Sequence, residues 1–357
     1  MRLLNLTVAL FFGIAAADLI LGCRFHLGDA LKEGLGVITE LLLLMTGFMA
    51  LSPWIAGHIA PAISPFLIRI GCDPSLFAGI LFSCDAGGAY LAQEIGIDSE
   101  AMIYNGLIVA SFFGTSLTGA VPLALTNTKG DKRKAAVKGL TAAFIFLPFA
   151  CILTGLFCGM SLLMMVRNTW PIALLSIVLL FGLLYFQNLM VRFFSILALL
   201  VKLAAYAGFS IAVWQDAGGF ILLEGLTPLD EIYPVIVRIG VFLGGILPIF
   251  SLLLRALQRP LILLSKRLKL TTESISYLFL STSNDIPTLM NLSRLDSTGI
   301  TVNVAYLMMT AYTVGDFLAF TMQFRPALAF PMMFGRLASG ILLIMICISK
   351  SIRKTDA

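Results

Sequence analysis

Nine long apolar stretches run through this chain of 357 residues and decide what it can fold into. They cover residues 3–23, 35–56, 101–125, 135–160, 171–186, 193–213, 233–254, 300–324 and 328–348. A bilayer core of about 30 Å takes about 20 apolar residues per helix. Charged residues make up only 12% of the chain, about half of what soluble proteins carry, which excludes disordered, nucleic-acid-binding and secreted disulfide-rich proteins. We therefore predict an all-α polytopic membrane protein with about nine transmembrane helices, embedded in the lipid bilayer and without a nucleic-acid partner.

Two further apolar segments are interrupted by polar tips. Residues 74–95 contain the run SCDAGG (83–88), and residues 272–289 contain the run STSNDIP (281–287). Glycine and proline break helices, and the backbone groups that they free cannot face lipid. Each segment is therefore predicted to be a short helix, a buried polar tip and a second short helix, which together make a re-entrant hairpin.

The distribution of basic residues predicts the orientation in the membrane. Lysine and arginine gather in residues 129–138, 255–269 and 350–354, whereas residues 216–231 carry only acidic charges. Loops rich in lysine and arginine stay cytoplasmic. All three basic segments face the cytoplasm only if both interrupted segments return to the side from which they enter, which places the N-terminus outside and the C-terminus inside.

The two halves of the chain share a pattern at one constant offset. This offset pairs Ser52 with Ser251, Pro61 with Pro260, Asp73 with Thr272, Ser75 with Ser274 and Asp85 with Asn284. The predicted topology makes the halves inverted repeats, with residues 1–163 (hairpin 74–95) before a linking span in 164–192 and residues 193–357 (hairpin 272–289) after it. Paired interrupted segments in inverted repeats are typical of secondary transporters, whose site lies near the midplane between the broken tips.

Acidic residues inside the apolar segments are the candidates for such a site. A carboxylate at the centre of a membrane helix costs about 2.5–3.5 kcal/mol on insertion scales, so it needs a partner. The nearest basic residues late in the chain, Arg325 and Arg336, are expected near span ends, which leaves a transported cation as the partner. The tips and the segment after them supply the predicted substrate-binding residues, with Tyr312 as an aromatic wall for an ammonium group: Ser83, Asp85, Ser281, Asn284, Asp285, Tyr312 and Asp316. The alternative for each acid is that it caps the N-terminus of a half-helix.

Other polar residues receive structural assignments. Asp18 and Glu40 lie on unbroken helix faces and are expected to form interhelical hydrogen bonds, whereas Asn105 and Asn303 are expected to add amide contacts to the site. The six cysteines form no CxxC pair, and the two histidines have no partner at metal-ligand spacing. No catalytic residue, metal site or cofactor is therefore predicted.

Several sequence blocks resemble those of a known family. DPSLFAG (73–79), CDAGG (84–88), NDIP (284–287) and DSTG (296–299) are similar to the hallmark blocks of the bacterial ethanolamine permeases of the ethanolamine-utilisation pathway, over nearly the whole chain. The resemblance implies a multi-pass protein of the bacterial inner membrane that passes ethanolamine to the cytoplasm. The family pattern would have asparagine at Asp285 and histidine at Phe317, so the selectivity among small amino alcohols stays open.

The predicted function is uptake of ethanolamine by alternating access. Ethanolamine is a primary amine that is protonated at neutral pH, like a lysine side chain. Asp85 and Asp316 are expected to bind the ammonium group, and Asn284 with Ser83 or Ser281 the hydroxyl group. A coupling cation, either sodium or a proton, and a homo-oligomeric state are left open.

Three other functions are weighed against this one. The main alternative is a cation-coupled transporter of another small solute such as a nucleoside, although a nucleoside site needs more amide and aromatic groups. An intramembrane aspartyl protease is disfavoured because Gly315-Asp316 has no Tyr-Asp dipeptide to accompany it. A membrane sensor is disfavoured because the chain has no soluble signalling segment. No enzymatic activity is therefore predicted.

Overall fold

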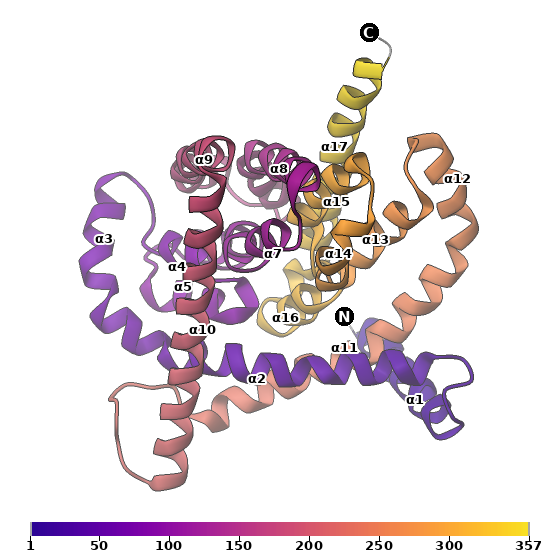
Figure 1. Cartoon of the computed structure of the whole chain (residues 1–357). Helices are drawn as coiled ribbons and strands as arrows, with labels where there is room; N and C mark the ends of the chain where they lie inside the picture. The colour runs from indigo at the N-terminus through magenta and orange to yellow at the C-terminus, as the bar shows by residue number, and fades with distance from the viewer. Residues whose placement is uncertain (1, 356–357) are drawn as a thin grey trace.

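The structure is a computed structural model that describes residues 2–355; the side chains of residues 2–3, 258–259, 264 and 349–355 lie outside this description. Four basic residues used for the predicted orientation, Arg259, Lys350, Arg353 and Lys354, are among the side chains not described. The described residues form helices and connecting turns, and no strand occurs among them (Figure 1). The prediction of an all-helical protein is confirmed.

Seven segments of the described chain are helices long and apolar enough to cross a membrane. They are α2 (Leu27–His58), the continuous run Ser99–Thr126, α8 (Gly130–Phe157), α9 (Leu162–Tyr185), α10 (Gln187–Gly218), α11 (Leu229–Ala256) and the run Pro326–Ile348. Each coincides with a predicted span, so the molecule is a polytopic membrane protein.

The two remaining predicted spans differ from this pattern. The N-terminal helix α1 (Arg2–Ile20) is apolar over the shorter stretch Leu4–Ile20. The span predicted at 300–324 is not continuous, because α15 (Ser297–Thr310) ends before α16 (Asp316–Phe324) begins. The prediction of one straight helix there is wrong, and the break falls directly before a predicted site residue.

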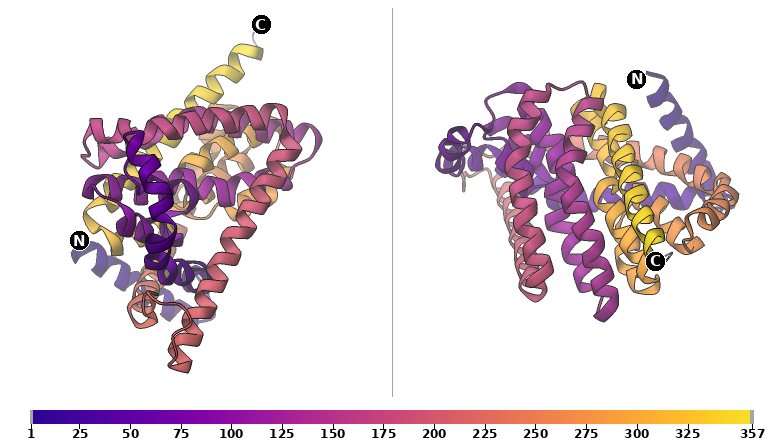
Figure 2. Two further views of the ribbon diagram at one scale, coloured as in Figure 1. Left: turned by 90° about the vertical axis from the view of Figure 1, so that its left-hand side faces the viewer. Right: turned by 90° about the horizontal axis from the view of Figure 1, so that it is seen from above.

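Helices α2 and α11 pack against each other across the molecule (Figure 1). Gly34 makes this close approach feasible, since a Cβ there would lie 2.6 Å from the backbone of Leu243. Small residues at helix contacts are the usual way in which membrane helices approach each other. The short helices that follow, α3 (Ala60–Arg69) after α2 and α12 (Gln258–Leu268) after α11, lie at opposite edges of the molecule (Figures 1 and 2).

The first interrupted segment folds back on itself. It consists of α4 (Leu76–Leu81), the turn η1 (Cys84–Gly88) and α5 (Ala89–Ile95). At its base, the Asp73 carboxylate accepts hydrogen bonds from the backbone amides of Ile97 (2.9 Å) and Asp98 (2.8 Å). The start and the end of the segment are thereby held together as a helical hairpin.

The second interrupted segment also reverses direction. It consists of α13 (Thr272–Ser283), α14 (Ile286–Asn291) and the short turn η4 (Leu292–Arg294). The Thr288 hydroxyl of α14 donates to the Tyr277 carbonyl of α13 at 3.2 Å. The cap of α13 is Thr271, whose side chain accepts from the Ser274 amide at 3.1 Å.

The helical run after each hairpin is joined to the hairpin by an asparagine. In the first half this run consists of α6 (Ser99–Ile103), the π-helical segments η2 (Tyr104–Gly114) and η3 (Ser116–Ala120), and α7 (Val121–Thr126). The Asn105 amide donates to the Ser75 hydroxyl (2.9 Å), and the Asn303 amide of α15 donates to the Ser274 carbonyl (3.2 Å). Both asparagines are fully buried in these contacts, so they hold the hairpins in place rather than adding amide contacts to a ligand.

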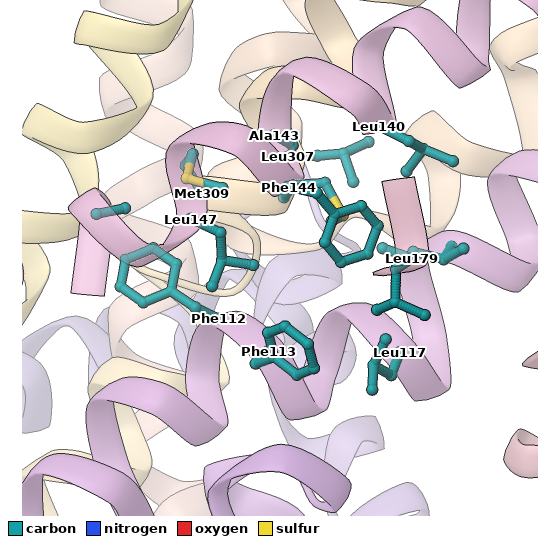
Figure 3. Packing of buried hydrophobic residues seen from close by; sticks show 14 of the residues in the cluster. Phe112, Phe113, Leu117, Leu140, Ala143, Phe144, Leu147, Leu179, Leu307 and Met309 are labelled. Atoms are coloured by element: carbon teal, nitrogen blue, oxygen red, sulfur yellow. The ribbon is translucent and has the colours of Figure 1, made fainter. Parts of the chain in front are cut away.

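A close-packed apolar layer supports one side of this arrangement (Figure 3). It joins η2 and η3 to α8, α9 and α15 through buried side chains, among them Phe112, Phe113, Leu117, Leu140, Phe144, Leu147, Leu179, Leu307 and Met309. The C-terminal helix α17 (Ala329–Thr355), preceded by the turn η5 (Pro326–Leu328), packs on α8 and α15 (Figure 2). The interrupted helices are thus backed by a firm scaffold.

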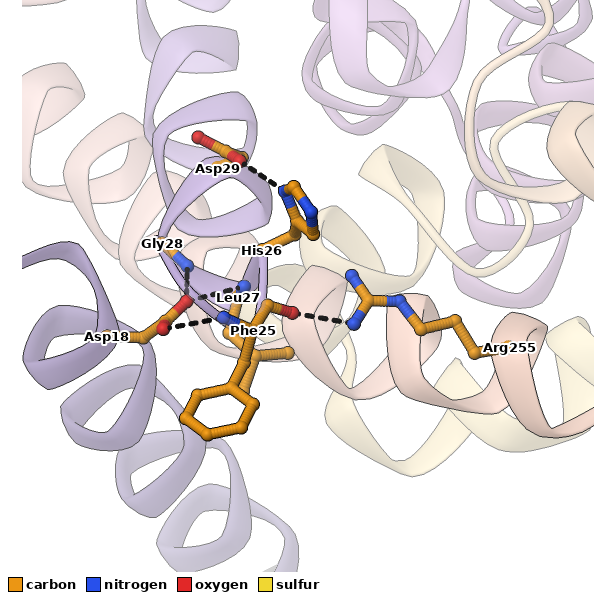
Figure 4. Close-up of polar contacts among 7 residues, drawn as sticks. All are labelled: Asp18, Phe25, His26, Leu27, Gly28, Asp29 and Arg255. Carbon is orange, nitrogen blue, oxygen red and sulfur yellow. Dashed lines mark hydrogen bonds and ion pairs between the residues drawn. The ribbon is translucent and has the colours of Figure 1, made fainter. Parts of the chain in front are cut away.

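Asp18 joins α1 to α2 as predicted for an interhelical hydrogen bond (Figure 4). Its buried carboxylate accepts from the backbone amides of Phe25 (2.9 Å), Leu27 (2.8 Å) and Gly28 (3.0 Å). These amides lie at and before the first turn of α2, where a negative charge is favoured. Arg255 of α11 also reaches this connection and donates to the Phe25 carbonyl at 2.6 Å.

Candidate functional site

The tip of the first hairpin presents a chain of polar side chains. The Thr115 hydroxyl donates to Ser83 at 2.8 Å, and the Ser83 hydroxyl donates to the Asp85 carboxylate through a short hydrogen bond. Asp85 itself is half-buried, so part of its carboxylate stays accessible. The tip therefore offers an oriented carboxylate with a hydroxyl beside it.

Glycines allow this tip to fit between its neighbours. Gly87 adopts a φ of +90°, a left-handed conformation that side-chain-bearing residues rarely take, and it packs on Phe48 of α2. Gly114 of η2 lies so close to the Phe82 carbonyl that a Cβ would overlap it. Gly87 thus serves the turn beside Asp85, and both Gly87 and Gly114 allow close packing against their neighbours.

The tip of the second hairpin is paired with the break between α15 and α16. The backbone amides of Tyr312 and Val314 donate to the carbonyls of Ser281 (3.3 Å) and Thr282 (2.8 Å). Gly315 lies directly against the Ser283 carbonyl, where no Cβ would fit. These contacts give the freed backbone groups of the break partners inside the protein, as a membrane-buried break requires.

Tyr312 has an unusual backbone conformation within this break. Its φ is +59°, which is uncommon for a residue other than glycine and costs of order 1–3 kcal/mol. Its ring lies 5.5 Å from the ring of Phe317. Such strain tends to occur at functional positions, and it holds Tyr312 beside Asp285 and Asp316.

One cavity of about 630 Å³ joins the two tips. Five of the seven predicted site residues line it: Ser83, Asp85, Asp285, Tyr312 and Asp316. Asp316 lies in the electrostatic field of both other aspartates. The structure therefore brings together three carboxylates that are up to 231 positions apart in the chain (Asp85 to Asp316), and their mutual repulsion favours binding of a cation.

Asn284 lies beside this cavity, in a small pocket that we call the neck. The neck has a volume of about 30 Å³ and is lined by Glu33, Val37, Glu40, Leu247, Ser283, Asn284, Ile286, Tyr312 and Asp316. It shares Tyr312 and Asp316 with the central cavity, and Glu33 and Ser283 with a second cavity of about 560 Å³ that is also lined by His26 and Asp29. The neck thus lies between two much wider spaces.

Ser281 is the predicted residue that the structure places elsewhere. It is fully buried, and its hydroxyl donates to the Tyr277 carbonyl (2.8 Å) and lies 2.9 Å from the Thr288 hydroxyl. It lines neither the central cavity nor the neck. Its contacts hold the two arms of the second hairpin together.

Glu40 is a residue for which an interhelical hydrogen bond was predicted. It is exposed and lines both the central cavity and the neck. One face of α2 carries Glu33, Val37 and Glu40 at helical spacing. This spacing is the sequence pattern that could have placed Glu40 at the site.

Basic residues also lie closer to the acids than the sequence analysis expected. Lys202 of α10 lines the central cavity. Arg336 is not near a span end but buried, with 1% of its surface exposed, two turns into α17. The sequence does not reveal how deeply Lys202 and Arg336 lie, because the depth of a side chain depends on where its helix begins. The expected position of Arg336 near a span end is therefore wrong, although neither basic residue forms an ion pair with the aspartates among the described side chains.

The described residues contain no group of three or more His, Cys, Asp or Glu side chains with the arrangement of a metal site. The three aspartates line the central cavity without forming such a group. An ammonium group, which needs hydrogen-bond acceptors and negative charge, suits this arrangement.

Comparison with known proteins decides the family. The family described as "Ethanolamine utilisation protein, EutH" matches residues 3–349. The chain belongs to the EutH family. The block of residues around both tips, on which the resemblance to ethanolamine permeases rests, lies within this EutH match.

Curated relatives of this EutH-family chain come from several bacteria. A protein of Listeria monocytogenes named as a probable ethanolamine permease EutH is 29% identical over 334 residues, which cover 94% of this chain and 90% of the relative. The probable ethanolamine permease EutH of Escherichia coli is 29% identical over 338 residues, covering 88% and 83%. The uncharacterized protein YxeR of Bacillus subtilis is 28% identical over 334 residues, covering 94% and 90%. No solved structure matches the chain.

Proposed function

We propose that this protein takes up ethanolamine into the bacterial cytoplasm across the inner membrane, as the ammonium form and by alternating access. The observation that carries the proposal is the central cavity, where carboxylates from both interrupted segments converge in a member of the EutH family. The names of the curated relatives, which are given as probable ethanolamine permeases, support the same substrate. A permease of this kind moves its substrate unchanged, so no catalytic group is needed.

The substrate has two polar ends, and the cavity offers partners for both. We assign the ammonium group to Asp85 and Asp316, since charge-assisted hydrogen bonds to carboxylates are the strongest available to it. We assign the hydroxyl group to Ser83, which lies beside Asp85, and to Asn284 at the entrance of the neck. Tyr312 provides an aromatic wall against the ammonium group. Ser281 has no part in this assignment because its hydroxyl is bonded within the hairpin.

The proposed mechanism rests on two inverted repeats with re-entrant hairpins, in residues 1–163 and 193–357. Equivalent contacts in the two halves support this architecture. Asn105 with Ser75 and Asn303 with Ser274 make matching bonds between hairpin and following helix. Helices α3 and α12, which follow α2 and α11, lie at opposite edges of the molecule, as inverted repeats require (Figure 1). Movement of one repeat against the other would expose the cavity to either side in turn.

The neck supports alternation between two access states. A volume of about 30 Å³ holds about one or two water molecules, so the neck is too small to hold an amino alcohol. The second cavity, beyond the neck, lies against Arg255 of the basic segment that is predicted to be cytoplasmic. Release into the cytoplasm therefore requires the neck to widen, which shifts the second hairpin tip relative to α2.

Asp285 gives the cavity one carboxylate more than the family pattern predicts. It is buried, with 2% of its surface exposed, yet it lines the cavity. We propose that this charge serves a coupling cation, sodium or a proton, that travels with the substrate. The oligomeric state does not enter this mechanism.

Uptake of labelled ethanolamine into liposomes containing the purified protein tests the proposal. Asp85→Asn and Asp316→Asn should each raise KM by about 10–100-fold, because a hydrogen bond to a charged group contributes about 1.5–3 kcal/mol. The matched control is Glu94→Gln, an exposed acid of the same hairpin that does not line the cavity, and it should leave KM unchanged.

Three outcomes contradict the proposal. Full uptake at low ethanolamine concentration by Asp85→Asn removes this residue from the site. Inhibition by nucleosides but not by small amino alcohols replaces the substrate. Uptake that does not change when sodium, pH and membrane potential are varied separately excludes a coupled or electrogenic process. A different result, loss of the sodium or pH dependence in Asp285→Asn, supports Asp285 as the coupling residue.

A further inference from the structure

The largest fully buried side chain among the described residues is a charged one, Arg336 of α17. Its guanidinium group forms four hydrogen bonds. Nε donates to the Thr313 hydroxyl (2.9 Å), Nη2 to the Ala311 carbonyl (3.0 Å), and Nη1 to both the carbonyl (2.8 Å) and the hydroxyl (2.7 Å) of Ser111. The five N–H groups of arginine have a fixed fork geometry, which lysine cannot reproduce.

The partners of Arg336 lie where the helices of the two halves depart from α-helical geometry. Ser111 belongs to the π-helical segment η2 of the first half. Ala311 and Thr313 belong to the break between α15 and α16 in the second half. Backbone carbonyls freed by such irregularities need donors from the protein when they are buried in a membrane protein. Arg336 supplies donors to both irregular segments at once and so connects them.

Two aromatic rings lie against the guanidinium group. Its central carbon lies 4.4 Å from the ring centre of Phe112 and 5.0 Å from that of Phe317. Phe112 follows Ser111, and Phe317 follows Asp316. The guanidinium group thus contacts one residue, Phe317, that is adjacent in sequence to a carboxylate of the cavity, although it does not line the cavity itself.

The hydrogen bonds of Arg336 go to neutral acceptors, which do not neutralise its charge. No carboxylate forms an ion pair with it among the described side chains. An uncompensated charge buried in protein costs several kcal/mol, so a negative charge nearby is required. The cavity carboxylate linked to this region is Asp85: Thr115, one turn after Ser111, donates to Ser83, and Ser83 donates to Asp85.

We propose that Arg336 is a positioning residue and the resident counter-cation of the substrate site: its fork holds the two irregular helix segments together, and its charge balances Asp85 when no substrate is bound. This inference rests on the proposed function, because it assumes that the cavity binds a cation. A site with its own cation binds an ammonium group less tightly than the carboxylates alone would, which suits a transporter that must also release its substrate.

The charge is tested by the melting temperature of the purified protein without substrate. Arg336→Gln should lower Tm by several degrees in the wild-type background. In an Asp85→Asn background the same change should lower Tm by less than half as much, since the charge that Arg336 balances is gone. The matched background is Glu94→Gln, where the full effect should persist. An equal effect of Arg336→Gln in all three backgrounds overturns the counter-cation role.

The fork is tested by uptake. Arg336→Lys keeps the charge and loses the bridging geometry, so the maximal uptake rate should fall at least tenfold while KM stays within threefold. A wild-type rate overturns the positioning role, and so does a parallel change in both parameters. If no Arg336 variant folds, Thr313→Val carries this test, because it removes one acceptor and keeps the arginine; it should lower the maximal rate at unchanged KM, and an unchanged rate overturns the proposal.

The two readouts separate this inference from the proposed function. The Tm comparison needs no substrate, so it reports the link between Arg336 and Asp85 even if the wild-type protein does not transport ethanolamine. The converse result is that Asp85→Asn raises KM while Arg336→Gln lowers Tm equally in all three backgrounds. This result removes the inference about Arg336 and leaves the proposed function in place.

Discussion

Two glycines of α2 receive opposite predictions for the same substitution. Gly34 is buried against α11, and a Cβ there would lie 2.6 Å from the carbonyl carbon and oxygen of Leu243 and 2.7 Å from the amide nitrogen of Gly244. Gly36, two residues further on, is exposed, and a Cβ there would meet nothing within 4 Å. Gly34→Ala and Gly36→Ala therefore differ in packing alone.

The magnitudes follow from helix propensity and overpacking. Alanine is favoured over glycine inside a helix by about 0.8–1.0 kcal/mol, so Gly36→Ala should stabilise the protein by that amount. Gly34→Ala gains the same propensity, but overpacking costs about 1–3 kcal/mol. The atoms in the way are backbone atoms, which cannot rotate aside, so the upper end of this range applies. We expect Gly34→Ala to be less stable than Gly36→Ala by about 3 kcal/mol.

Unfolding of the purified variants in mixed micelles of increasing denaturing detergent, followed by tryptophan fluorescence, measures this difference. The uptake rate should also fall in Gly34→Ala, because α2 carries the wall of the neck. The reasoning is refuted if Gly34→Ala is as stable as Gly36→Ala or more so, since α2 and α11 would then not approach as closely as the structure places them.

Two further predictions concern the site. Ser83→Ala should raise KM for ethanolamine about tenfold, since it removes a hydroxyl that is bonded to a carboxylate, whereas Ser281→Ala should lower Tm and change KM less than twofold; the reverse pattern in uptake and melting experiments would show that Ser281 faces the substrate. Glu40→Gln should raise KM about two- to fivefold, because an exposed carboxylate attracts the cation through solvent, and the effect should shrink as salt is added. An effect of Glu40→Gln that is larger and insensitive to salt would instead indicate direct binding.

Much of the fold could be predicted from the sequence because lipid imposes a simple length requirement. Seven predicted spans are continuous helices, and glycine or proline in both tips indicated where the chain would reverse. The break at residues 311–315 carries a single glycine and no proline, so its apolar sequence reads as part of one helix. This break depends on partners far away in sequence, namely the carbonyls of α13 and the guanidinium of Arg336, which no local pattern reports.

The candidate site was predictable in part because the apolar interior of a membrane makes charged side chains costly. Carboxylates in apolar segments are rare, so Asp85, Asp285 and Asp316 stand out without knowledge of the fold. Hydroxyl groups do not stand out in this way, and Ser83 and Ser281 look alike in the sequence although one lines the cavity and the other bonds within its hairpin. Asn105 and Asn303 likewise look like ligand residues until their buried contacts are known.

The small volume of the neck has different consequences for an amino alcohol and for water. A space of about 30 Å³ beside two wide cavities cannot hold an amino alcohol until the protein rearranges. The same space has room for water. Glu33 and Glu40 lie along it. The volume of the neck thus excludes the solute but not water, so its size alone does not determine whether protons are excluded.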